Sequence, residues 1–258
     1  MKQYIVDAFT DKIFSGNPAA VCVLEDFPSE DIMQNITAEN NLSETAFVVK
    51  ENDRYHIRWF TPKREIDFCG HATLAAAYIL FNYYAQDMDT LNFYGQIGEL
   101  SVQKSDELIR MEFPAYKLEH IEITDTMIEA LGTIPLAAYK DRDILFILRD
   151  EDEVRDLQPN MELLSKLDGA CIAVTAKGTE YDCVSRVFAS RFGIDEDPVT
   201  GSTHCMIAPY WSRRLNKTDI SAFQASSRTG ILYCESVGEK VIISGKAVLF
   251  SINDIVDL

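Results

Sequence analysis

The feature that most constrains this chain is an uncharged segment in its first half. Residues 68–86 contain no Asp, Glu, Lys or Arg, and the middle of the segment reads ATLAAAYILF. A helix built from these residues is apolar on every side, so other elements have to surround it. Polar residues in the segment, such as His71, Asn82 and Gln86, argue against a membrane span. Strands wrapped around a central helix are the simplest arrangement that buries such a helix in a water-soluble fold.

A second segment of the same kind lies in the other half of the chain. In the first half, a strand around residues 58–60 leads through a loop to Cys69-Gly70-His71 and the uncharged helix. In the second half, a strand around residues 186–188 leads to Thr200-Gly201-Ser202 and then to THCMIAPYW. The two glycines are 201 − 70 = 131 residues apart, about half of the 258-residue chain. This spacing predicts two similar halves, with chance similarity between two common strand-loop-helix units as the alternative.

The rest of the chain consists mainly of short β-rich runs separated by turn residues, which indicates an α+β fold. Helical patterns are fewer: one near residues 29–39 carries a Ser cap, and another lies near residues 124–131. The run LIRMEF ends at Pro114, which favours a junction between the halves at this point. We therefore expect domains at residues 1–116 and 117–258, with a last strand that can return to the first half. The runs expected to be strands include YIVDAF, AAVCVLE, TAFVVKE, YHIRWF, CIAVTA, CVSRVF and KVIISG.

Charge and cysteine usage exclude several classes of partner. The chain carries 41 acidic and 24 basic side chains, a net charge of -17 that repels nucleic acid and anionic membranes. Its six cysteines are scattered, with no CxxC pair and no histidine at zinc-ligand spacing, so we expect no metal site. The start, MKQYIVDAFT, has no long apolar run of the kind found in secretory signals, and we expect a cytoplasmic protein with reduced thiols.

The two glycine-led helices have a chemical consequence. The first turn of a helix carries unpaired backbone N–H groups and partial positive charge, so it binds anions. Gly70 and Gly201 let a ligand approach the backbone closely, and His71 and Ser202 each add a side-chain donor. If both helices point into one cleft, they can hold a carboxylate and stabilise an enolate formed beside it. Plain helix capping is the alternative for either helix taken alone.

Four longer motifs identify a family. The segments SGNPAAV (15–21), NLSETAFV (41–48), RWFTPKREIDFCGHATLAAA (58–77) and DEDPVTGSTH (195–204) resemble the PhzF-like family of phenazine biosynthesis, and Gln224, Arg228 and Gly230 resemble its later Q…R.G segment. The resemblance runs in order over nearly the whole chain. It implies a fold like that of diaminopimelate epimerase, in which two similar domains, each a β-barrel around a central helix, enclose the active site between them.

The resemblance also implies roles for single residues. In the namesake isomerase one glutamate acts as both acid and base, which carries over to Glu44, and the motifs carry His71, Asp197 and Ser202 into the site as well. A carboxylate that removes a carbon-bound proton becomes more basic when it is partly withdrawn from water, and Glu44 stands at the start of an apolar strand. The implied activity is a cofactor-independent isomerase of a small cyclic or amino carboxylate. Family members often form homodimers, so a homodimer is possible.

Three alternatives to an isomerase with a single glutamate as acid and base remain open: a racemase, a lyase or hydratase, and a binding protein. Related racemases use two cysteines, but this chain has Cys69 in the first half and Thr200 at the matching position of the second, and a hydroxyl is a poor substitute for a thiol. A lyase or hydratase could use the same cleft through the same carbanion. A binding protein could hold carboxylates without exchanging their carbon-bound protons. His56 and His204 are interpreted as packing or surface residues.

Overall fold

The computed structural model of the chain describes residues 1–96 and 98–256, which form two compact units. The first unit comprises Met1–Glu112 with Ser244–Leu258, and the second comprises Phe113–Ile243. The expected boundary lay between residues 116 and 117. The first unit therefore ends four residues earlier than expected (116 − 112 = 4), and the chain returns to it after Ile243, a return that the sequence had left open.

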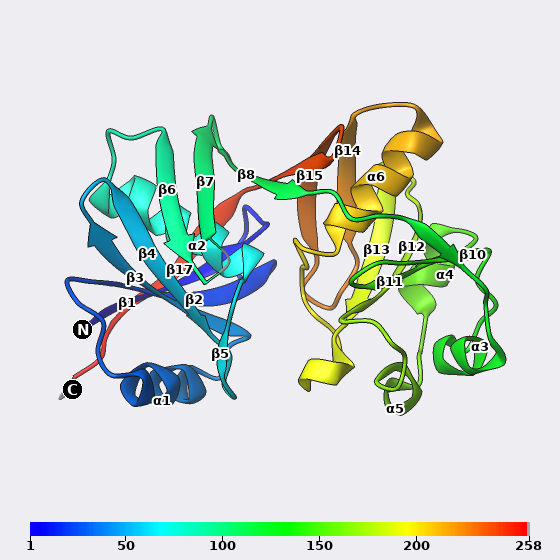
Figure 1. Cartoon of the computed structure of the whole chain (residues 1–258), viewed down its shortest axis with the longest axis horizontal. Coiled ribbons are helices and arrows are strands. Elements are labelled where there is room, and N and C mark those ends of the chain that lie inside the picture. The colour runs from blue at the N-terminus through cyan, green and yellow to red at the C-terminus, as the bar shows by residue number, and fades with distance from the viewer. Residues whose placement is uncertain (97, 257–258) are drawn as a thin grey trace. The chain divides into compact units, whose positions relative to one another are not determined.

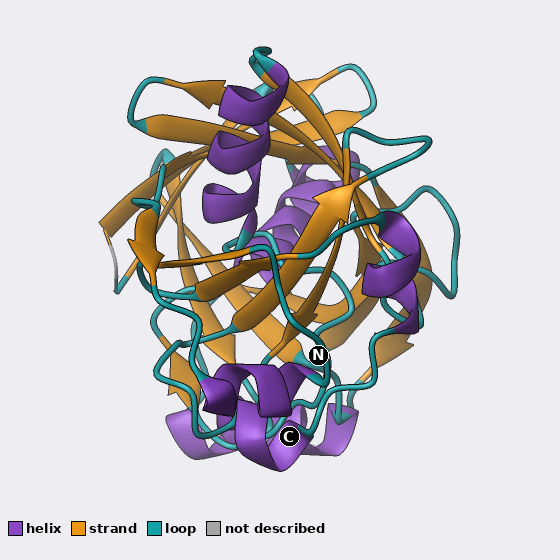
Figure 2. Ribbon diagram, turned by 90° about the vertical axis from the view of Figure 1, so that its right-hand side faces the viewer, coloured by secondary structure: helices purple, strands orange, loops and turns teal. Residues whose placement is uncertain are grey.

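Strands predominate in both units, and the helices are few (Figures 1 and 2). The chain has an α+β fold, as the sequence indicates. The elements of the first unit, in chain order, are β1 (Lys2–Ala8), β2 (Asn17–Leu24), α1 (Glu30–Asn40), β3 (Glu44–Glu51), β4 (Arg54–Phe60), β5 (Glu65–Ile66), α2 (Gly70–Ile79), the π-helical turn η1 (Leu80–Tyr84), β6 (Thr90–Gly95), β7 (Gly98–Ser105), β8 (Leu108–Pro114, which ends in the second unit) and the final β17 (Ala247–Asp254).

The elements of the second unit follow a similar order. They are β9 (Glu119–Ile121), α3 (Asp125–Leu131), β10 (Ala137–Lys140), β11 (Ile144–Ile147), α4 (Glu151–Asp156), α5 (Met161–Leu164), β12 (Ile172–Lys177), β13 (Cys183–Phe188), the 3₁₀ turn η2 (Ser190–Phe192), α6 (His204–Leu215), β14 (Asp219–Gln224), β15 (Gly230–Val237) and β16 (Lys240–Gly245), whose end reaches the first unit.

Strand pairing follows one pattern in both units. In the first, β1 and β2 are antiparallel, β2 and β3 parallel, β3 and β4 antiparallel, β4 and β6 parallel, and β6 and β7 antiparallel. The second unit repeats these five relations in the same order with β10, β11, β12, β13, β14 and β15. The buried helix α2 connects the parallel pair β4 and β6, and α6 connects the parallel pair β13 and β14. The internal repeat expected from the sequence is therefore present in the topology.

The helix α2 is enclosed by its own unit, as its lack of charge requires. Residues 71–77 and Ile79 are all buried, and the helix contacts β1, β2, β3 and β17. Its alanines present no long side chains, so the surrounding strands can approach on every side. No helix in the described part of the chain is long and apolar enough to cross a membrane.

The helix α6 differs from the expectation in where it begins. The sequence placed Gly201 at the mouth of a helix that begins with Thr203, whereas the regular helix starts one residue later, at His204. Residues 201–203 form a tight turn, in which the backbone N–H of His204 donates to Gly201 O at 3.0 Å and that of Cys205 to Ser202 O at 3.0 Å. These bonds span three residues, so the first turn is wound more tightly than an α-helix.

Each unit holds the loop before its central helix with an arginine–glutamate pair at the matching strand position. Arg58 donates from Nε and Nη2 to both carboxylate oxygens of Glu65, each at 2.7 Å. Arg186 does the same with Glu196, at 2.7 and 2.9 Å. Such two-pronged pairs fix geometry as well as charge. The pairs tie β4 and β13 to the loops that lead into Gly70 and Gly201.

The second of these pairs should matter more for stability than the first. Arg186 is more buried than Arg58, and its Nη1 also donates to the backbone oxygens of residues 154, 155 and 157. We expect Arg186→Met to lower the free energy of unfolding by about 2–4 kcal/mol, because Glu196 and three carbonyl groups lose their partner. Arg58→Met should cost about 1 kcal/mol. Urea unfolding of the two variants tests this order, which equal losses would contradict.

Candidate functional site

The carboxylate of Glu44 lies inside the first unit although it begins a strand. The chain leaves α1 through Asn41, whose left-handed backbone (φ 50°) turns it sharply into β3. Residues 44–49 of β3 are all buried, and Glu44 itself is only 9% exposed. A carboxylate withdrawn from water in this way needs a nearby cation or a set of hydrogen-bond donors.

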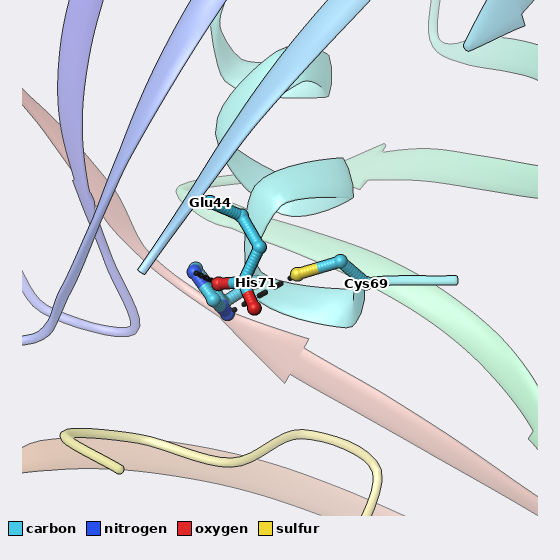
Figure 3. A group of neighbouring side chains, drawn as sticks. All are labelled: Glu44, Cys69 and His71. Carbon is cyan, nitrogen blue, oxygen red and sulfur yellow. Dashed lines mark hydrogen bonds and ion pairs between the residues drawn. The ribbon is translucent and has the colours of Figure 1, made fainter. Parts of the chain in front are cut away.

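His71, the second residue of α2, supplies the group beside Glu44. The Nε2 atom of His71 lies 3.1 Å from Glu44 Oε2, and Figure 3 shows the two side chains pointing at one another. The contact has the distance of an ion pair but not the alignment of a hydrogen bond. Among the described residues, neither of these two atoms has a hydrogen-bond partner. Both atoms are therefore buried polar groups with capacity left for a ligand.

The other ring nitrogen of His71 faces two further side chains. Its Nδ1 lies 3.4 Å from Cys69 Sγ and 3.3 Å from Asn17 Nδ2. Asn17 is completely buried and begins β2. It follows Gly16, whose backbone is left-handed (φ 69°) and where a Cβ atom would lie 2.2 Å from Ala8 O. The turn before Asn17 thus requires glycine, and it delivers the amide to the imidazole.

These contacts set the charges of the cluster. Burial alone would lower the pKa of His71, but Cys69 and Glu44 raise it by more, and the pKa lies well above its ordinary value. Burial and the nearby Glu44 raise the pKa of Cys69, against the opposing effect of His71. A protonated thiol carries no charge, so in this cluster it is the carboxylate of Glu44 that favours the imidazolium form of His71.

The same three side chains include the atom types that metals prefer. One ligand atom from each of Glu44, Cys69 and His71 lies within 4.8 Å of the others. However, the imidazole presents Nε2 to the carboxylate and Nδ1 to the thiol, on different edges of the ring. A metal ion needs one ring nitrogen to face both other ligands, so the ring would have to turn. The arrangement fits a chain of hydrogen-bonding groups better than a metal centre.

The predicted residues of the second unit form a separate group around Gln224. Thr200 donates its hydroxyl to Asp197 Oδ2. The side chain of Gln224 donates to Asp197 O at 2.7 Å and accepts from the backbone N–H of Thr200 at 2.9 Å. Gly201 is buried, and Ser202 is half-buried with its Oγ accepting from Arg142 Nη2 at 3.2 Å. The motif residues 197–202 are thus held in one rigid turn.

Of the six residues predicted for the site, the structure brings Glu44, Gly70 and His71 together in the first unit and Asp197, Gly201 and Ser202 together in the second.

Sequence reasoning missed two contacts of the site. Asn17 lies within the segment SGNPAAV but received no role there. Arg142 belongs to no motif, and only its hydrogen bond to Ser202 reveals it. Of the two histidines left out of the site, His204 is wholly buried and donates to Thr200 O, and His56 pairs with Glu51 on the surface.

With this geometry in place, comparison with known proteins shows the family. Residues 6–252 match the model of the PhzC-PhzF family, described as phenazine biosynthesis-like protein. The chain belongs to the phenazine biosynthesis-like family. An uncharacterized isomerase of Pseudomonas aeruginosa is 46% identical to this family member over 95% of the chain and 94% of the relative. The names of such relatives support an isomerase.

Solved structures agree with this assignment. A crystal structure of a PhzF-family phenazine biosynthesis protein from Enterococcus faecalis is 51% identical, covers 97% of each chain and superposes with a TM-score of 0.95. A predicted epimerase of Pseudomonas aeruginosa is 18% identical, covers 100% of this chain and 99% of its own, and has a TM-score of 0.75, which shows a shared fold. The fold is the diaminopimelate epimerase-like one that the sequence motifs implied.

Proposed function

We propose that this family member is an isomerase that moves a proton between two carbons of a small carboxylate without a cofactor, with Glu44 as its single acid and base. The observation that carries the proposal is the contact between Glu44 and His71: a buried carboxylate and a buried imidazolium, 3.1 Å apart, each with capacity for a ligand. A carboxylate held in this way can remove a proton from carbon.

The proposed reaction has two proton transfers. Glu44 removes a proton from one carbon, and the electron pair of the C–H bond moves into the adjacent unsaturated system to form an enolate-type anion. The protonated Glu44 then returns the proton to a second carbon, where the electron pair forms the new C–H bond. The carboxylate is regenerated, and no electrons are gained or lost. The positive charge of His71 stabilises both the starting carboxylate and the negative charge that develops in the substrate.

Cys69 is not the base in this scheme. Its thiol is buried, and burial raises its pKa, so little thiolate is present to accept a proton.

We also propose that Asp197, Gly201 and Ser202 bind the substrate or assist its reaction, as their motif implies. Variants Asp197→Asn and Ser202→Ala test this part on its own.

The test of the function is proton exchange in deuterated water. Purified protein is incubated with amino, hydroxy and cyclic dienoic acids, and label is read by NMR at each carbon. Incorporation at a carbon beside a carbonyl or double bond, with formation of the isomer, is the expected result. Binding of an acid without exchange in any candidate would favour the carboxylate-binding alternative. Loss of water or another fragment from the substrate would favour a lyase.

Gly70 offers a prediction that separates folding from function. In the described part of the chain, the atoms that a Cβ atom added at Gly70 would meet within 4 Å belong to the Phe68 ring, at 3.9 and 4.0 Å, so packing does not require glycine there. We expect Gly70→Ala to change the free energy of unfolding by less than about 1 kcal/mol. Exchange should nevertheless fall by at least about tenfold, because the methyl group displaces a ligand from the backbone N–H groups.

The control for Gly70→Ala is a glycine that packing does require. At Gly95 a Cβ atom would lie 2.9 Å from the Trp59 ring and 3.0 Å from Ile57 O. Gly95→Ala should therefore lower stability, measured by urea unfolding. Full exchange activity in Gly70→Ala would mean that no substrate approaches this helix end.

A further inference from the structure

A second polar cluster lies in the C-terminal unit, at the turn between β10 and β11. Its centre is Arg142, whose guanidinium group contacts four side chains. Nε contacts Asp143 Oδ1 at 3.0 Å, and Nη1 donates to Tyr116 Oη at 3.3 Å. Nη2 donates to Ser202 Oγ at 3.2 Å and lies 3.9 Å from Cys171 Sγ. The guanidinium thus donates a hydrogen bond to Ser202, one of the residues proposed to bind substrate.

Asp143 fixes this guanidinium in place. Its side chain is completely buried. Oδ1 also accepts from the backbone N–H of Cys171 at 3.0 Å, and Oδ2 accepts from Thr203 Oγ1 at 2.8 Å. A buried carboxylate bound this firmly needs a permanent cation beside it. Arg142 is therefore preorganised and not a mobile surface side chain.

The internal repeat shows what this cluster corresponds to. In the first unit Thr45 pairs with Phe60, and in the second Ile172 pairs with Phe188, at the same place in the repeated pattern. The residue before each is Glu44 in the first unit and Cys171 in the second. The residue after the motif glycine is His71 in the first unit and Ser202 in the second. Arg142 Nη2 thus contacts the two residues that match the Glu44 and His71 pair.

The chemistry at these matching positions differs between the units. Glu44 and His71 can both gain and lose a proton. In the second unit, burial raises the pKa of the Cys171 thiol to about 12, Ser202 is a neutral hydroxyl, and a guanidinium does not release its proton. None of these three groups therefore exchanges a proton readily near neutral pH. At the place where the first unit has a reactive pair, the second cluster keeps a permanently charged guanidinium that is paired with the buried Asp143.

Arg142 also has capacity for a ligand. Its side chain is 38% exposed, and only one of the two N–H groups of Nη1 has a partner among the described residues. Guanidinium groups bind carboxylates in a planar, often two-pronged geometry. In a chain of net charge -17, such a local cation is needed to overcome the long-range repulsion of an anionic ligand.

We propose that Arg142, together with Ser202, binds the carboxylate group of a small carboxylic acid. The proposal rests on the proposed function for the identity of the ligand as a small carboxylic acid. It goes beyond that function by naming the residue that distinguishes an acid from its neutral analogue.

The test compares a cyclic carboxylate with its neutral amide. Benzoate and benzamide are titrated against the full-length protein by isothermal calorimetry, with Arg142→Gln, Arg142→Lys and a control variant. Benzoate should bind the wild type more tightly than benzamide. Its Kd should rise at least about tenfold in Arg142→Gln and less in Arg142→Lys, which keeps the charge but loses the planar fork. The same Kd in Arg142→Gln, no saturable binding of benzoate to the wild type, or equal binding of benzamide would overturn the proposal.

Two controls keep the result interpretable. Arg54 lies over the ring of Tyr94, as Arg142 lies over that of Tyr116, but it pairs with Glu99 on the surface. Arg54→Gln should therefore leave benzoate binding unchanged. Arg142→Gln leaves Asp143 without its cation, and the double variant Arg142→Gln/Asp143→Asn removes both charges together. It should fold, as read by circular dichroism, and still fail to bind benzoate. Restored binding in the double variant would show that Arg142 acts only on folding.

The same measurements separate this proposal from the isomerase itself. Benzoate need not be a substrate, so its binding does not depend on turnover. Benzoate binding that depends on Arg142, in a protein that exchanges protons with no acid, would overturn the isomerase and leave the anion site. Exchange in the wild type, with unchanged benzoate binding in Arg142→Gln, would support the isomerase and overturn the role of Arg142 in binding the anion.

Discussion

Glu44→Gln is expected to lose carbon–proton exchange by about 1,000-fold, the size of effect that follows removal of a general base. Glutamine keeps the shape of the side chain but cannot accept a proton from carbon. The fold should remain, because the amide of glutamine can still contact His71. The rate is measured by NMR in deuterated water with the best acid from the exchange panel.

A matched control exists on the same strand. Glu51 ends β3 as Glu44 begins it, and Glu51 also pairs with a histidine, His56, at 3.4 Å, but on the surface. Glu51→Gln should retain full exchange activity. A similar loss in both variants would point to damage of β3 and not to removal of a base, and unchanged activity in Glu44→Gln would exclude Glu44 as the base.

His71→Gln is expected to lower exchange by about 100-fold, as for the loss of one group that stabilises a developing negative charge. The glutamine amide can still contact Glu44, but it brings no positive charge. His56→Gln, which alters the exposed histidine–glutamate pair, is the control and should keep its activity. Equal activity in His71→Gln and the wild type would contradict a role for the imidazolium.

The same variant also changes how stability depends on pH. The pKa of His71 is raised in the folded protein, so the folded state binds its proton more tightly than the unfolded chain does. The stabilising contribution is fully present below the ordinary histidine pKa of about 6.5 and is lost as the pH rises through the raised value. Urea unfolding of the wild type from pH 6 upward, in steps of about one unit, should show this fall, and His71→Gln should lack that part of it.

The sequence predicted the elements of the fold better than their exact limits. The Ser29 and Thr124 caps start α1 and α3 where expected, since a side-chain oxygen accepts the first free N–H groups of each helix. The start of α6 was misplaced by one residue (204 − 203 = 1), because the hydroxyl-rich run Thr200 to Thr203 favours a tight turn over a regular helix. Local patterns do not show how such a turn closes.

The candidate site could be predicted only where a motif marked it. Glu44 and His71 are 27 residues apart in the chain (71 − 44 = 27), and the segments NLSETAFV and CGH named both. Asn17 and Arg142 escaped because they act through contacts made after folding, between β2 and α2 in one case and at the turn between β10 and β11 in the other. Charge alone could not select Arg142 from the other arginines, and its contacts with the buried Asp143 and with Ser202 become visible only in the folded chain.

The most direct test of a single acid and base is the fate of the proton itself. An acid that exchanges is prepared with deuterium at the carbon from which the proton leaves, and it is converted in ordinary water. If one buried carboxylate carries the proton, part of the deuterium appears at the second carbon of the product, on the same face. Product whose second carbon carries only solvent hydrogen, formed at the same rate by Glu44→Gln, would contradict the mechanism.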